Sequence, residues 1–141
     1  MFLGEYQHSL DVKGRVILPA KFRDQLAAGA YVTKGDQCLF VYTAEEFMSV
    51  AGDVREQAKL EPRRREAARS FFAGAAEVTP DKQGRVAIPT QLREYAALER
   101  DVTVVGVFSR IELWDSARWR AREAAGDQSL ADVDALSDFG I

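Results

Sequence analysis

The sequence is short of the residues from which metal centres, disulfides and many active sites are built. It has one cysteine, Cys38, and one histidine, His8, so no intrachain disulfide can form and neither residue has a His or Cys partner at ligand spacing. It contains neither a P-loop nor a Gly-x-Ser-x-Gly motif, and no carboxylate is linked by spacing to a partner acid or base. These absences argue against an enzyme, and we expect no metal and no cofactor.

Long apolar runs are also absent. A membrane-spanning helix needs about 20 consecutive apolar residues, and no stretch of the sequence approaches that length. The N-terminus lacks the basic start and apolar block of a secretory signal. Cys38 lies in an apolar run, where a buried, reduced thiol is expected. We therefore expect a cytoplasmic protein with no membrane contacts.

The overall charge is slightly negative, with 19 Lys+Arg against 22 Asp+Glu. The chain has 141 residues, of which 47% are hydrophobic and 29% charged, as is typical of a soluble globular protein. This length is enough for one domain that buries around two thirds of its unfolded surface. In an acidic chain, locally basic segments indicate a directed binding surface and not general affinity for polyanions.

One hexad, Asp-Xaa-Xaa-Gly-Arg-Val, occurs twice, at residues 11–16 and 81–86, with a constant offset of 70 residues. Each copy continues through a proline to a further arginine, which is Arg23 in the first copy and Arg93 in the second. A repeat of this extent predicts a fold built from two like units.

Most of the hexad is explained by turn and core chemistry. Asp at the first position and Gly at the fourth favour a type I turn, because the carboxylate accepts a backbone N–H two residues on and glycine takes a positive φ without strain. This accounts for the four turn-fixing residues, Asp11, Gly14, Asp81 and Gly84. Val16 and Val86 are assigned to the core.

The residues that flank each turn predict a β-hairpin. Apolar and polar residues roughly alternate over residues 2–9, and aliphatic residues follow the first turn, as expected of two strands with a short connection. A proline then ends the strand and opens a short helix, from Ala20 to about Ala27 in the first copy. In the second copy Thr90 is available as the helix cap.

Each half then continues with two strands and a capped helix. We expect strands at 31–33 and 39–42, and at 102–108 and 111–114. The helices would begin at a capping box, Thr43–Glu46, and at Asp115 or Ser116. Between the halves, residues 53–72 are predicted to be helical with a break near Glu61-Pro62.

We predict an α+β fold in one domain, because a single hairpin with a short helix is too small to be stable alone. Two tandem hairpin-plus-helix repeats would form one pseudo-twofold, β-barrel-like core with the helices packed outside. The expected parts are a first repeat (1–50), a helical connector (51–75), a second repeat (76–125) and an acidic tail (126–141).

Turn and core chemistry leave Arg15 and Arg85 unexplained. Three interpretations stay open: an exposed strand residue, an ion pair with the turn aspartate, or a ligand contact through the guanidinium fork, which suits phosphate oxygens or a guanine edge. Recurrence in both copies favours the last two. More basic residues lie near the turns: Lys13, Lys21, Arg23, Lys82 and Arg93.

Two other charged segments have more than one interpretation. Arg63-Arg64-Arg65, with Arg69 one turn on, is a solvated helix face, an auxiliary phosphate contact or an interface with an acidic neighbouring subunit. The tail from Asp127 intersperses aspartates with apolar residues, and it is either loosely ordered or a short helix that docks on a neighbour. His8 fits a polar strand position.

The doubled Asp-x-x-Gly-Arg pattern, followed by an aliphatic residue, Pro and Arg, resembles the MraZ family of bacterial transcriptional regulators. That family is related in fold to AbrB-type swapped-hairpin DNA-binding domains. The opening Met1–Tyr6 and the segment Arg69–Ala75 also resemble the family, so the similarity runs from residue 1 to about 120. The resemblance implies a homo-oligomeric ring that binds short direct repeats upstream of the division and cell-wall gene cluster, to which the regulator's own gene belongs.

On this basis the protein is expected to be a nucleoid-associated repressor that reads double-stranded DNA through two basic hairpins. Arg15 and Arg85 would enter the groove or clamp phosphates, and Lys13 and Lys82 would contact the backbone. Identical surfaces around a ring would suit repeats spaced by about one helical turn, near 10 base pairs. The alternative is a ring-forming module whose hairpins bind an acidic protein, without specific DNA binding.

Overall fold

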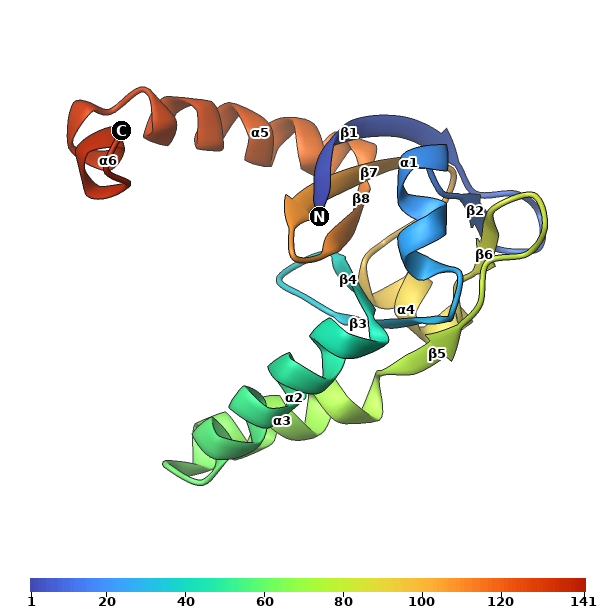
Figure 1. Cartoon of the computed structure of the whole chain (residues 1–141), viewed down its shortest axis with the longest axis horizontal. Coiled ribbons are helices and arrows are strands. Elements are labelled where there is room, and N and C mark those ends of the chain that lie inside the picture. Colours follow the sequence, from blue (N-terminus) through green and yellow to red (C-terminus); the bar gives the residue numbers. More distant parts are fainter.

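The computed structural model describes the whole chain, residues 1–141, and its strands form two sheets (Figure 1). The larger, six-stranded sheet is antiparallel with the order β1-β7-β8-β4-β3-β5. The smaller is the antiparallel pair β2–β6, which we call the ribbon. The strands are β1 (Phe2–Ser9), β2 (Arg15–Ile17), β3 (Ala30–Lys34), β4 (Leu39–Thr43), β5 (Ala76–Val78), β6 (Arg85–Ala87), β7 (Asp101–Phe108) and β8 (Ile111–Asp115).

The helices follow the strands in both halves. They are α1 (Ala20–Arg23) with a 3-10 turn η1 (Asp24–Leu26), α2 (Ala44–Ala58), α3 (Pro62–Ala73), α4 (Thr90–Tyr95), α5 (Ser116–Leu130) and α6 (Val133–Asp138). Two predicted caps are confirmed: Thr43 caps α2 and Asp115 caps α5, each accepting a backbone N–H three residues on. The predicted Thr90 cap is wrong. Pro89 occupies that position, and the Thr90 hydroxyl, already inside the helix, accepts from the Arg93 side chain.

The predicted hairpins are wrong in their pairing. The first turn does form, since the Gly14 N–H donates to the Asp11 carbonyl at 3.0 Å and the Asp11 N–H donates to the Arg15 carbonyl at 2.9 Å. Beyond it, however, β1 pairs along its whole length with β7, and β2 pairs with β6. Turn chemistry fixes only the local reversal. The long β1–β7 ladder and the joint burial of the ribbon valines decide the partners.

The large sheet is open, so the predicted barrel-like core is also wrong, although the α+β class is confirmed. β1 pairs only with β7 and β5 only with β3, which leaves both as edges. The strand order interleaves the two halves of the chain. The first strand of each half, β1 or β5, lies beside a strand of the other half, β7 or β3.

One cluster of 18 buried apolar residues draws on both halves and lies beneath the ribbon. The ribbon contributes Val16 and Val86, which are 0% and 1% exposed, and the residues that follow it, Leu18 and Ile88, are buried as well. Strand alternation explains why the side chains between them face outward. An isolated two-stranded ribbon is marginal in water, so this core is what holds it in place.

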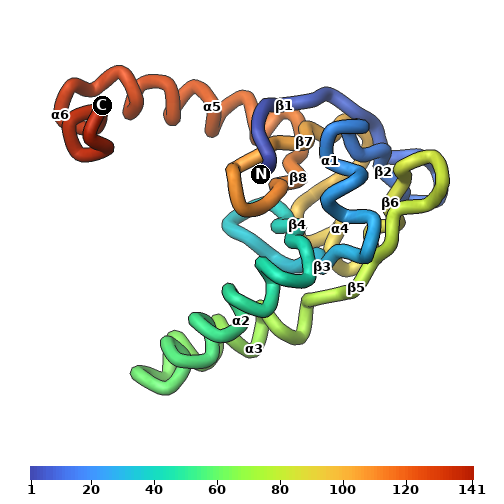
Figure 2. Tube along the Cα trace, viewed as in Figure 1, coloured from blue at the N-terminus to red at the C-terminus, as the bar shows by residue number.

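Two helical arms extend from the sheet away from the ribbon (Figures 1 and 2). The first arm is α2 with α3, which pack side by side, and the second is α5 with α6. The predicted break at Glu61-Pro62 is confirmed, but the helix expected from Asp53 is the later part of α2, which begins at Ala44. Of the two alternatives for the tail, the helical one is observed: α5 continues to Leu130 and α6 follows.

The two rare residues of the sequence occupy ordinary structural positions. Cys38 is buried, and desolvation raises the pKa of its thiol far above the ordinary value. His8 lies in β1 opposite Val102, where partial burial, with the Arg23 charge nearby, lowers its pKa. In addition, none of the helices is both long and apolar enough to cross a membrane.

Truncation of Leu18 tests how the ribbon is anchored. Leu18 is 0% exposed, and removal of a buried leucine side chain costs about 2–5 kcal/mol. In urea denaturation, Leu18→Ala should lower the free energy of unfolding by about 3 kcal/mol. The adjacent residue Ile17 is 42% exposed, so Ile17→Ala is a matched control that should cost less than about 1 kcal/mol. Equal losses from the two variants would contradict the assignment of an inner and an outer face.

Candidate nucleic-acid interface

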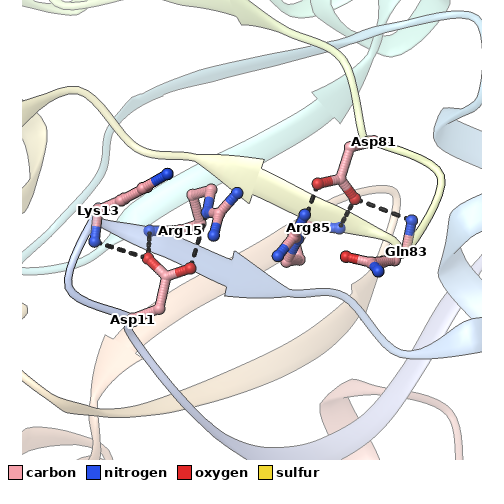
Figure 3. A network of polar contacts seen from close by, with 6 residues as sticks. All are labelled: Asp11, Lys13, Arg15, Asp81, Gln83 and Arg85. Carbon is pink, nitrogen blue, oxygen red and sulfur yellow. Dashed lines mark hydrogen bonds and ion pairs between the residues drawn. The ribbon is translucent and has the colours of Figure 1, made fainter.

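The first hexad turn is held by one carboxylate that makes three bonds (Figure 3). Asp11 Oδ1 accepts the backbone N–H groups of Lys13 and Arg15, each at 2.9 Å. Asp11 Oδ2 accepts Arg15 Nε at 2.7 Å. The backbone bonds form an Asx turn, and the side-chain bond is a short, charge-assisted ion pair. Asp11 therefore fixes the turn and also aims the arginine.

The second turn repeats this geometry. Asp81 Oδ1 accepts the backbone N–H groups of Gln83 and Arg85 at 2.9 Å, and Asp81 Oδ2 accepts Arg85 Nε at 2.7 Å. The tip residues differ, since Gln83 stands where the first turn has Lys13. Because only their backbone takes part, the turn geometry does not depend on the tip side chains.

The ion pairs establish the bracing role of Arg15 and Arg85 without occupying either guanidinium fully. Only Nε is bonded within the chain, and the Nη1 and Nη2 donors have no partner there. The two arginine side chains are 26% and 30% exposed. A guanidinium fixed at Nε and free at Nη is an oriented donor pair at the surface. Bracing and ligand contact are therefore compatible roles.

The same bonds lower the pKa of Asp11 and Asp81 below the ordinary value of 3.8. The main cause is the backbone N–H of the arginine that follows, assisted by the arginine side chain and by the second backbone N–H. Partial desolvation acts in the opposite direction and is outweighed. Both carboxylates are therefore charged at neutral pH, and both arginines remain braced.

The two halves of the chain cross at the turn glycines. The Leu18 N–H donates to the Gly84 carbonyl at 2.9 Å, and the Ile88 N–H donates to the Gly14 carbonyl at 3.0 Å. These bonds extend the β2–β6 ladder at both ends. Each turn is therefore tied to the other half of the chain.

An arginine from the opposite half also covers each glycine. A side-chain carbon at Gly14 would lie 1.4 Å from Arg93 Nη1, and one at Gly84 would lie 2.0 Å from Arg23 Nε. Both glycines also have a positive φ, +73° and +78°, which other residues rarely adopt. The positive φ favours glycine at both positions, and any side chain there would also displace the covering arginine.

The remaining predicted contact residues fall into two groups. Arg23 and Arg93 are half-buried and make structural bonds, from Arg23 Nε to the Leu18 carbonyl at 2.9 Å and from Arg93 Nη2 to Thr90 Oγ1 at 2.8 Å. The lysines are exposed: Lys13 and Lys82 at the turn tips, and Lys21 on α1.

The outer face of the ribbon contains residues that sequence reasoning missed. The register places Arg15 opposite Ala87 and Ile17 opposite Arg85, so these four side chains share the outward face. Ile17 is 42% exposed although it is a large apolar residue. Because side chains alternate along a strand, the assignment of Val16 to the core could have predicted that Ile17 faces outward. The 70-residue offset aligns Ile17 with Ala87, and this comparison could have shown that the two outer faces differ at this position.

This arrangement is suited to a polyanionic ligand. A two-stranded ribbon fits the major groove of B-DNA, and a fixed guanidinium can bind a guanine edge or a phosphate. The ribbon carries Arg15 and Arg85 on its outer face, and the two turns lie at its ends (Figure 3). Lys13 and Lys82 are exposed at the tips of these turns. The pairing thus brings Arg15 and Arg85, which are 70 positions apart in the sequence, onto one face of the ribbon.

The lowered pKa values predict acid sensitivity. A depressed carboxyl pKa contributes stability that is present above the unfolded value, about 4, and is lost as pH falls through the folded pKa. The double variant Asp11→Asn/Asp81→Asn should have a lower melting temperature at pH 7 and a smaller further decrease on acidification than the wild type. Circular dichroism melts at a series of pH values measure both. Lys13→Ala keeps the backbone bond and should show the wild-type profile, and parallel curves for all three proteins would contradict the proposed cause.

Comparison with known proteins identifies the family. The family model "MraZ protein, putative antitoxin-like" matches residues 1–69 and 71–137. Proteins named transcriptional regulator MraZ are similar over most of their length: 48% identity in Salinispora arenicola over 95% of both chains, 49% in Acetivibrio thermocellus over 93% of this chain and 91% of the other, and 43% in Halothermothrix orenii over all of both. The chain, with its doubled and crossed Asp-x-x-Gly-Arg turns, belongs to the MraZ family.

Proposed function

We propose that this protein is a transcriptional regulator, a repressor and not an enzyme, that binds specific sequences of double-stranded DNA through the outer face of the ribbon. The observation that carries the proposal is the pair of recurrent arginines, each held by an aspartate at Nε and free at Nη on an exposed ribbon. The regulator names of the relatives support the same function.

In this proposal the ribbon enters the major groove. Arg15 and Arg85 bind guanine edges or phosphates, and Lys13 and Lys82 contact phosphates on either side. The aspartate braces lower the entropic cost of binding, because each guanidinium is already oriented before DNA arrives. They also leave no uncompensated carboxylate facing the phosphates, since Asp11 and Asp81 are both ion-paired.

We further propose that several subunits act together as a homo-oligomeric ring on short direct repeats. The operator would lie upstream of the division and cell-wall gene cluster, which includes the regulator's own gene, and the protein would reside on the nucleoid in the cytoplasm. One ribbon offers few contacts, so joint binding by several subunits is needed to raise avidity. Repeats about one helical turn apart, near 10 base pairs, would present the same groove to successive subunits.

The helical arms support self-association. Both arms expose large apolar side chains: Met48 (70% exposed), Leu60 (65%), Leu130 (50%), Val133 (79%) and Phe139 (70%). Self-association through the arms would cover these side chains. Because both arms point away from the ribbon, contacts through them would leave the proposed DNA surface free (Figure 1).

The charges of the arms indicate how two copies would meet. α3 carries four arginines, Arg63, Arg64, Arg65 and Arg69, of which Arg64 and Arg69 are paired with glutamates of the arm. Residues 124–141 carry four aspartates and no Lys or Arg. An apolar groove of about 340 Å³ between α2 and α3 includes Val54, Ala68 and Phe71. We propose that the acidic, apolar tail of a second copy lies along the basic helix α3 of this arm.

Substitution of the two recurrent arginines tests DNA binding. Arg15→Ala and Arg85→Ala should each weaken binding to the region upstream of the gene by about 5- to 150-fold, as for loss of one bidentate base contact. A gel-shift titration at two salt concentrations measures the change. If the lost contact is to a phosphate, the slope of log affinity against log salt should fall by about one.

Three controls separate contact from bracing. Arg120→Ala removes an exposed arginine on α5, distant from the ribbon, and should bind as the wild type does. Asp11→Ala removes the brace but keeps Arg15, so it should lose less affinity than Arg15→Ala. A melting curve for each variant shows whether the fold survives. Wild-type binding by both arginine variants would refute their role, and equally weak binding of operator and random duplex by the wild type would favour the protein-interaction module instead.

Charge exchange between the arms tests the oligomer. Asp132→Lys/Asp134→Lys/Asp138→Lys should reduce the mass measured by size-exclusion chromatography with light scattering, because like charges would then face each other. Arg63→Glu/Arg65→Glu should have the same effect, since neither arginine has a partner within the chain. Combining both sets in one chain should restore the large species. Wild-type mass in the tail variant would rule out this interface.

A further inference from the structure

The two halves of the ribbon are matched in the Asp and Gly that fix their turns and in their core valines, whereas the outer face is matched only at its arginines. Arg15 and Arg85 correspond, as do Val16 and Val86, yet Ile17 corresponds to Ala87. The Ile17 side chain has no role in the core, because the residues on either side of it fill the interior and are 0% exposed. A half-exposed isoleucine at one end of the proposed binding ribbon is therefore available to an external partner.

The strand register shows that an external partner of Ile17 would lie next to the ligand of Arg85. Ile17 lies directly opposite Arg85 in the antiparallel pair. The Cβ atoms of opposed residues are about 5 Å apart, whereas successive bases along one strand are about 3.4 Å apart. The two side chains can therefore reach neighbouring base pairs. At the other end of the ribbon, Arg15 lies opposite Ala87, whose single methyl group reaches much less far.

Resting on the proposed DNA binding, we propose that Ile17 is a specificity-determining residue that contacts the C5-methyl group of a thymine beside the base pair read by Arg85. In the major groove the thymine methyl is the apolar group available to such a side chain, and the arginine fork prefers guanine. The ribbon then reads a guanine and a neighbouring thymine at one end and only the guanine at the other.

This asymmetry has a consequence for orientation. A ribbon with identical ends would read both directions of a site equally and would suit a palindrome. Ile17, together with the tip differences Val12-Lys13 against Lys82-Gln83, gives the ribbon a direction. A directional reader is what direct repeats require, because every subunit must meet its repeat in the same orientation.

Replacement of thymine by deoxyuridine tests the contact, because it removes only the C5-methyl group. In a scan of the bound operator, deoxyuridine at one thymine of a repeat should weaken wild-type binding about fourfold, the effect of exposing one buried methyl-sized group. Ile17→Ala should weaken binding to the thymine duplex by at least as much and should be insensitive to deoxyuridine at that position. Ile17→Val, which keeps a branched side chain, should lie between the two.

The controls separate this inference from DNA binding itself. Ala87→Ile should leave the effect of the original thymine unchanged, because it alters the opposite end of the ribbon. If the wild type binds the operator and no deoxyuridine weakens it, or if the deoxyuridine effect persists in Ile17→Ala, the methyl contact is refuted and DNA binding stands. If the wild type binds none of the duplexes, the proposed function and the inference both fail.

Discussion

The exchange of backbone hydrogen bonds between the two turns is the constraint on which the rest of the structure depends. The Leu18 N–H donates to the Gly84 carbonyl, and the Ile88 N–H donates to the Gly14 carbonyl. Each half of the chain therefore needs the other half to pair its ribbon strand. A two-stranded ribbon has little stability alone, and here it is held from below by valines of both halves. The crossing also places Arg93 over Gly14 and Arg23 over Gly84. Hence each candidate contact arginine lies on a strand that is held in place by pairing with the opposite half of the chain.

Local chemistry could be predicted from the sequence, and non-local pairing could not. The Asx bonds of Asp11, the Thr43 cap and the break before Pro62 depend on residues within one turn of each other, and all three were recovered. The partner of β2 lies 70 positions away, and a turn signal does not encode it. Closure of a sheet likewise depends on how all edge strands meet, which is why the predicted barrel is an open sheet.

The candidate site shows the same division. Recurrence identified Arg15 and Arg85, and chemistry suggested both of the roles that their geometry permits, as brace and as contact. What the sequence could not show is that these roles use different nitrogens of one guanidinium. Nor could it show that Arg23 and Arg93, similar in sequence context, are half-buried over the turns, because that depends on the crossing of the two halves. A basic residue near a motif can therefore support the site without facing the ligand.

A duplicated sequence motif makes it simple to tell required residues from variable ones within a single chain. Positions that hold the crossing, such as Asp11 with Asp81 and Gly14 with Gly84, are identical in both halves, because any change would disturb the turn or the ladder. Ile17 and Ala87 face outward and make no such bonds, so these two positions were free to diverge. Divergence confined to the outer face alters what the ribbon meets and leaves the fold as it is. On the proposed function, this difference gives a ribbon with two similar strands the direction needed to read a repeated, non-palindromic site.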